Sequence, residues 1–127
     1  MKHVYQNRFR KNNGNCSQAA IASLLEIPLE KAFDIWDCSD DDWWDSMLAW
    51  FEAEGYSVDP NMPFGERKGV KGFFIAIVPS MFFDSSLHAV VINIKGMVAH
   101  DPNPNGKWLG RNVFHEDVVE SYYPVEE

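Results

Sequence analysis

The sequence predicts a single α+β domain in which N-terminal helices pack on a C-terminal antiparallel sheet. Apolar residues in the first half recur at helical spacing, whereas the second half contains short continuous apolar runs that are typical of buried strands. The length of 127 residues fits one domain over residues 1–127. Hydrophobic residues make up 46% of the chain, which excludes a disordered protein.

Three helices are predicted in the N-terminal half. The first covers Cys16 to Glu26, where several alanines allow close packing on a sheet. The second covers Pro28 to Trp36, and the third covers Trp43 to Glu54. The aspartates between Asp37 and Asp42 are expected to supply the N-cap and the acidic first turn of the third helix.

Strands are predicted in the C-terminal half. Tyr56 to Val58 begins a strand, and Gly72 to Val78 is a buried strand because its apolar run is continuous. The loop between them, Pro60 to Lys71, has the length of loops that border active sites. The tail is expected to hold a short strand or helix around Asn112 to Val119, with Tyr122, Tyr123 and Val125 available to close the sheet.

The stretch from His88 to Asp101 predicts a β-hairpin with a defined register. A two-residue turn at residues 95–96 makes Val90 face Asp101, so Asp101 becomes the diagonal neighbour of His88 on one face of the sheet. Diagonal neighbours are about 7 Å apart, a distance that an imidazole and a carboxylate can bridge. His100 is then expected to point to the opposite face.

Cys16 is the candidate nucleophile. It follows the polar loop Asn12 to Asn15 and opens an alanine-rich helix, where backbone N–H groups and the helix dipole favour a thiolate. A nucleophilic cysteine needs a base and a third group that orients the base, and His88 and Asp101 are the candidates. A cysteine without such partners is more often a buried structural thiol.

These residues resemble the papain-like cysteine peptidases in their minimal bacterial form. The resemblance is carried by Asn15 to Leu29, by the His88-Ala-Val-Val start of one strand and by the His100-Asp101-Pro102 end of the next, and it extends from Val4 to about Gly110. The chain is similar to the domains that trim double-glycine leader peptides, and to short phage and prophage proteins. This resemblance implies a papain-like fold, a Cys-His-Asp triad, a thioester at Cys16, a peptide or small protein substrate, and phage or prophage origin.

The resemblance also implies a side-chain amide upstream of Cys16 that helps to bind an oxyanion. Gln6 is the preferred candidate, although it stands further from the cysteine than in the larger enzymes of the family. Asn12, Asn13 and Asn15 are the alternatives. Asparagines at such positions also serve as ordinary turn formers and N-caps.

Charge and cysteine content limit the partners. Nineteen acidic and eleven basic residues give a net charge of −8, and the one basic cluster is Arg8, Arg10 and Lys11. We therefore expect no nucleic acid partner. The cluster could instead lower the pKa of Cys16 or meet an acidic substrate segment. Two cysteines, no signal peptide and no membrane-length apolar run predict a cytoplasmic protein with reduced thiols and no membrane partner.

Three alternatives to a peptidase remain. The same triad serves acyl transferases, in which an amine takes the place of water. A papain-like fold with an inert site would act as a binding or counter-defence module. Residues 101–106 match the opening of an EF-hand loop, but Asn112 stands where that loop requires a glutamate, and an Asx turn explains the same residues. We therefore expect neither a metal nor a cofactor.

Overall fold

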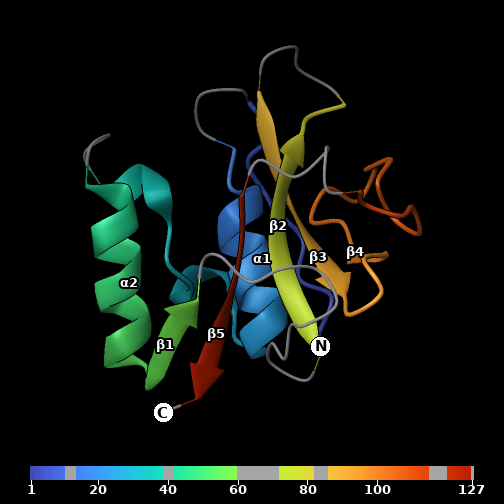
Figure 1. Ribbon diagram of the computed structural model, residues 1–127. Helices are drawn as coiled ribbons and strands as arrows, with labels where there is room; N and C mark the ends of the chain where they lie inside the picture. Colours follow the sequence, from blue (N-terminus) through green and yellow to red (C-terminus); the bar gives the residue numbers. More distant parts are fainter. Residues whose placement is uncertain (11–13, 39–41, 60–71, 82–85, 115–119, 127) are drawn as a thin grey trace.

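The computed structural model describes residues 1–10, 14–38, 42–59, 72–81, 86–114 and 120–126. The fold is mixed α+β (Figure 1). Its elements are the helices α1 (Cys16–Leu25) and α2 (Trp43–Ala53), the 3-10 segments η1 (Leu29–Lys31) and η2 (Ile35–Asp37), and the strands β1 (Tyr56–Asp59), β2 (Phe73–Pro79), β3 (Leu87–Asn93), β4 (Val98–His100) and β5 (Glu120–Glu126). None of the described helices has the length and apolarity of a membrane span.

Several sequence expectations fall outside the described residues. They concern Lys11, Asn12 and Asn13 before the cysteine, residues 39–41 of the acidic run, most of the loop after β1, and residues 115–119 of the tail.

The five described strands form one antiparallel sheet in the order β1-β5-β2-β3-β4. Strand β5 therefore lies in the interior of the sheet, where it pairs with β2 at one end and with β1 at the other. Helix α1 packs on β2 and β3, and α2 packs beside β1 (Figure 1). The helices precede the strands along the chain, as predicted.

Strands β2 and β3 are buried on both faces, which explains their continuous apolar sequences. Ile75 and Val91 belong to the core on the helix side, together with residues of α1 and α2. Phe74 and Val90 belong to a second core on the other side, which Trp108 and residues after β4 cover. The alternation of side chains along a strand divides the apolar residues between these two cores.

The predicted helix over Pro28 to Trp36 is wrong. Two short 3-10 segments occupy this stretch, with extended backbone between them. The side-chain amide of Gln18 donates to the carbonyls of Leu29 and Ala32, and the carboxylate of Asp34 accepts an N–H of η2. Hydrogen bonds from side chains thus replace the backbone bonds of a helix.

The hairpin of β3 and β4 has the predicted register beside the candidate site but a different turn. The predicted two-residue turn is wrong, because the N–H of Asn93 donates to the carbonyl of Met97 and leaves a three-residue loop, 94–96. A bulge in β4 then compensates for the extra residue, and Val91 pairs with His100 at the predicted offset.

The N-terminal segment is fixed to α1 and to the end of β4. Ser23, which is fully buried in α1, accepts a 2.9 Å hydrogen bond from the N–H of Val4, and its carbonyl accepts one from Lys2. The N–H of Gln6 donates to the carbonyl of Pro102 at 2.9 Å. These bonds fix the backbone of residues 2–6 beside α1 and the end of β4.

We expect Ser23→Ala to lower the free energy of unfolding by about 1–3 kcal/mol, because it leaves the N–H of Val4 without its partner. Urea unfolding followed by circular dichroism measures this change. The exposed Ser57 provides the matched control, and Ser57→Ala should stay within about 0.5 kcal/mol. Equal stabilities of the two variants would contradict an anchoring role for Ser23.

Candidate active site

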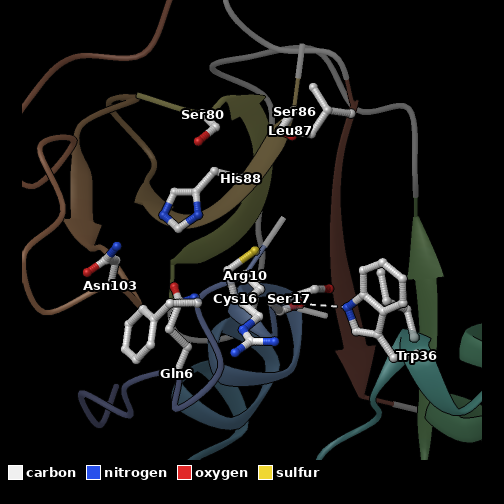
Figure 2. Close-up of a pocket in the computed structure, with 13 residues that line it drawn as sticks. Gln6, Arg10, Cys16, Ser17, Trp36, Ser80, Ser86, Leu87, His88 and Asn103 are labelled. Carbon is white, nitrogen blue, oxygen red and sulfur yellow. Dashed lines mark hydrogen bonds between the residues drawn. The ribbon is translucent and has the colours of Figure 1, made fainter. Parts of the chain in front are cut away.

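Three side chains from separate elements converge at one end of the sheet. Cys16 is the first residue of α1, His88 is the second residue of β3, and Asp101 follows β4. The Nε2 atom of His88 lies 2.6 Å from Oδ1 of Asp101. The sulfur of Cys16 points toward the imidazole of His88 (Figure 2), and it accepts a 3.4 Å hydrogen bond from the N–H of Ala89. The structure therefore brings together the three residues selected from the sequence.

The orientation of the His88 ring follows from its contact with Asp101. Because Nε2 is engaged by the carboxylate, Nδ1 is the nitrogen that remains for the thiol of Cys16. A carboxylate on one side and a sulfur on the other stabilise the doubly protonated ring, since both positions then act as donors. The imidazole can therefore exchange a proton with Cys16 while its position stays fixed.

The charges of the site favour a thiolate at Cys16. Burial by itself would raise the pKa of the thiol, but the hydrogen bond and the charge of His88, with the N–H groups of Ala89 and Ser17, outweigh it and lower the pKa of Cys16. For His88, burial would lower the pKa, yet the hydrogen bonds with Asp101 and Cys16 raise it to about 9. The two shifts together describe a thiolate–imidazolium pair.

The carboxylate of Asp101 is held in place by the loop that follows it. Oδ1 accepts the N–H of Asn103 at 3.0 Å, which is the predicted Asx turn, and Oδ2 accepts the N–H of Trp108 at 3.3 Å. Burial opposes ionisation, but the bond to His88 and these two N–H groups lower the pKa of Asp101. A Cβ atom on Gly106 would overlap the carboxylate, so only glycine fits there.

Gln6 lies beside the same cavity and is buried, with 8% of the residue exposed. Its Nε2 group donates to the carbonyl of Arg8 at 2.9 Å, which leaves one of the two amide protons for another acceptor. Its Oε1 atom is buried and has no hydrogen-bond partner among the described residues. An unpaired polar atom in a cavity beside a nucleophile is suited to contact a ligand.

Asn15 was an alternative to Gln6 as the amide that binds the oxyanion, but its side chain has a structural role. Its Oδ1 atom accepts the N–H groups of Asn7 and Arg8, and its Nδ2 group donates to the side chains of Asn7 and Gln18. Two backbone donors at Oδ1 determine the orientation of the amide, and both amide protons are used. Asn15 therefore ties the N-terminal segment to α1 and is not available to bind an oxyanion.

Two residues of the basic cluster before Cys16, Arg8 and Arg10, lie in different environments. Arg8 forms an ion pair with Asp34, a buried carboxylate, and it is not among the groups that lower the pKa of Cys16. Arg10 instead lines the cavity that contains the cysteine.

The cavity at Cys16 and His88 has a volume of about 270 Å³. Its walls are mostly apolar and include Phe9, Trp36 and Leu87. The sequence carries no signal for these wall residues, because Trp36 falls in a predicted helix that does not form and single apolar residues have no spacing pattern. Within the described segments, no group of three His, Cys, Asp or Glu residues could hold a metal ion.

Comparisons of this chain with protein-family models, with curated proteins and with solved structures found no match. The chemistry of the site therefore has to follow from its own geometry and charges. This chemistry is inferred from the His88–Asp101 contact, the position of Cys16 and the residues that line the cavity.

We expect Gly106→Ala to displace the carboxylate of Asp101 and to lower the pKa of His88 from about 9 toward its ordinary value. Nuclear magnetic resonance titration of the imidazole measures this shift. Asn105→Ala, an exposed change in the same loop, should leave the pKa of His88 as it is. An unchanged titration in the Gly106 variant would show that the loop does not position Asp101.

The lowered pKa of Cys16 and the raised pKa of His88 predict a distinct pH profile for alkylation by iodoacetamide. At about pH 6, Cys16 should react faster than Cys38 because imidazolium holds it as a thiolate. Its rate should fall as the pH drops through the lowered pKa of Cys16, and it should change again as the pH rises through about 9, where His88 loses its proton. His88→Ala should slow Cys16 about tenfold or more at the lower pH. Equal, slow labelling of both thiols at that pH would contradict the ion pair.

Proposed function

We propose that this protein is a cysteine-dependent peptidase or isopeptidase of papain-like fold, with Cys16 as nucleophile. The observation that carries the proposal is the position of His88, which contacts the carboxylate of Asp101 through Nε2 and the thiol of Cys16 on its other side. This is the arrangement of nucleophile, base and orienting group that acyl transfer requires.

The arrangement of elements supports a papain-like fold. A helix carries the cysteine at its first residue, and an antiparallel sheet carries the histidine and the aspartate in the chain order Cys, His, Asp. Cys16 and Cys38 are both free thiols, which suits a phage or prophage protein that works in the reducing cytoplasm.

In the proposed reaction, the thiolate of Cys16 attacks the carbonyl carbon of an amide and forms a carbon–sulfur bond. The carbonyl electrons move to oxygen, and the proton on Nδ1 of His88 passes to the leaving nitrogen as the carbon–nitrogen bond breaks. Water then attacks the thioester carbonyl carbon and gives a proton to Nδ1 of His88, and the carbon–sulfur bond breaks with its electron pair going to the sulfur of Cys16. The acid product leaves, and the thiolate–imidazolium pair is restored while Asp101 keeps the ring in place.

The oxyanion that forms on the substrate needs hydrogen-bond donors. The N–H of Cys16 stands at the first residue of α1, where the helix supplies no backbone acceptor. We assign the second donor to the remaining Nε2 proton of Gln6, whose other amide proton is bonded to Arg8. The unpartnered Oε1 of Gln6 would accept an N–H of the substrate backbone.

A library of short acetylated peptides, with cleavage followed by mass spectrometry, tests this proposal. The native protein should release new amino termini, and acid quenching should trap an acyl group on Cys16. Cys16→Ala should abolish cleavage, and His88→Ala should reduce its rate by about 10²- to 10⁴-fold.

Cys38→Ala is the matched control for thiol loss, because Cys38 lies outside the cavity and packs against the core, and this variant should keep full activity. Cleavage that survives in Cys16→Ala would refute the proposed nucleophile. Rapid alkylation of Cys16 without cleavage of any peptide would favour an inert binding module. Acyl transfer to an added amine in preference to water would identify a transferase.

A further inference from the structure

The walls of the cavity at Cys16 indicate which substrates it fits. We infer that it binds a short acyl segment that combines one apolar side chain with one carboxylate, the apolar group against Trp36 and the carboxylate at Arg10. The inference deepens the proposed function and rests on it for the reaction. Binding itself can be measured without cleavage, so the two can fail separately.

The apolar part of the inference rests on exposed side chains that gather at one place. Phe9, Trp36 and Leu87 are 47%, 43% and 54% exposed, and all three line the cavity that contains Cys16. Exposed apolar residues scattered singly are normal, whereas a group around one cavity marks a binding surface. An apolar side chain of a substrate would remove this surface from water.

Trp36 is fixed in place before any ligand arrives. Its Nε1 atom donates a 2.7 Å hydrogen bond to the carbonyl of Gly14, which Figure 2 shows as a dashed line. The backbone at Trp36 is held by the carboxylate of Asp34, which accepts its N–H. A wall that is already ordered costs little conformational entropy when a ligand binds.

The charged part of the inference rests on Arg10. It is the one cationic Lys or Arg side chain that lines the cavity in the described part of the chain, and no Asp or Glu of that part lines it. Figure 2 draws Arg10 among the residues that line this cavity, together with Cys16 and Ser17. Arg8 differs, because its guanidinium is paired with Asp34.

The net charge of −8 strengthens the argument that Arg10 itself attracts an anionic ligand. An anionic ligand is repelled by the protein as a whole, although salt screens exposed charges beyond about 8 Å at physiological ionic strength. Specific attraction must then come from a guanidinium within contact distance, which also matches the planar shape of a carboxylate. The volume of about 270 Å³ limits the bound segment to one or two residues.

Protection of Cys16 from iodoacetamide by peptide probes tests the inference without any need for cleavage. The probes are acetyl-Glu-Leu-amide, acetyl-Gln-Leu-amide and acetyl-Glu-Gly-amide. We expect the first to give half-protection at a concentration about fivefold below the second, and about tenfold below the third. In Arg10→Gln the difference between the first two should disappear. In Trp36→Ala the half-protecting concentrations of acetyl-Glu-Leu-amide and acetyl-Glu-Gly-amide should become more similar. Phe9→Ala should also reduce this difference.

Arg111→Gln is the matched control, because Arg111 is exposed and does not line the cavity. If it abolishes the preference for glutamate as Arg10→Gln does, general charge explains the preference and the inference fails. Equal protection by all three probes, or protection by none at millimolar concentration, also overturns it. If the expected order of protection appears but no peptide is cleaved, the inferred substrate class stands and the peptidase proposal fails. If peptides are cleaved but the order of protection is absent, the peptidase proposal stands and the inferred substrate class fails.

Discussion

The contact between His88 and Asp101 governs the charge state of the cleft. A buried imidazole would ordinarily be neutral, and a buried thiol beside it would then stay protonated. The carboxylate reverses this balance, because it stabilises the imidazolium that in turn stabilises the thiolate of Cys16. The ionisation of Cys16 and that of His88 are therefore linked, and Asp101 supports both through the imidazole, so the site is one electrostatic unit.

That unit depends on segments that contribute no reactive atom. The loop after β4 surrounds the carboxylate of Asp101 with two N–H groups and the bare backbone of Gly106. On the opposite side, Asn15 and Ser23 hold the N-terminal segment against α1, which places Gln6 at the cavity. Polar residues that do not react themselves thus hold the candidate catalytic groups in place through hydrogen bonds.

Local patterns predicted most of the fold, and long-range contacts account for the errors. The α+β class, α1 and α2 follow from periodicity. The offset that pairs Val91 with His100 was expected from a two-residue turn; that turn is wrong, and the offset is correct because a bulge in β4 compensates for the extra loop residue. The helix predicted over residues 28–36 failed because Gln18, distant in sequence, binds its carbonyls. The position of Cys16 at the start of a predicted helix, that of His88 at the start of a predicted strand, and the family resemblance together selected these two residues. No such signal marks the wall residue Trp36, whose place depends on the stretch that does not form the predicted helix.

The interior position of β5 has a consequence for biosynthesis. Strands β1 and β2 are neighbours in the sequence, yet each pairs with β5, so they cannot be joined in the sheet until residues 120–126 have left the ribosome. A nascent chain that already displays Cys16 and His88 has at that stage an incomplete sheet and exposed strand edges. Closure of the sheet therefore depends on contacts between residues far apart in the sequence, and such contacts form slowly because a long loop must close first.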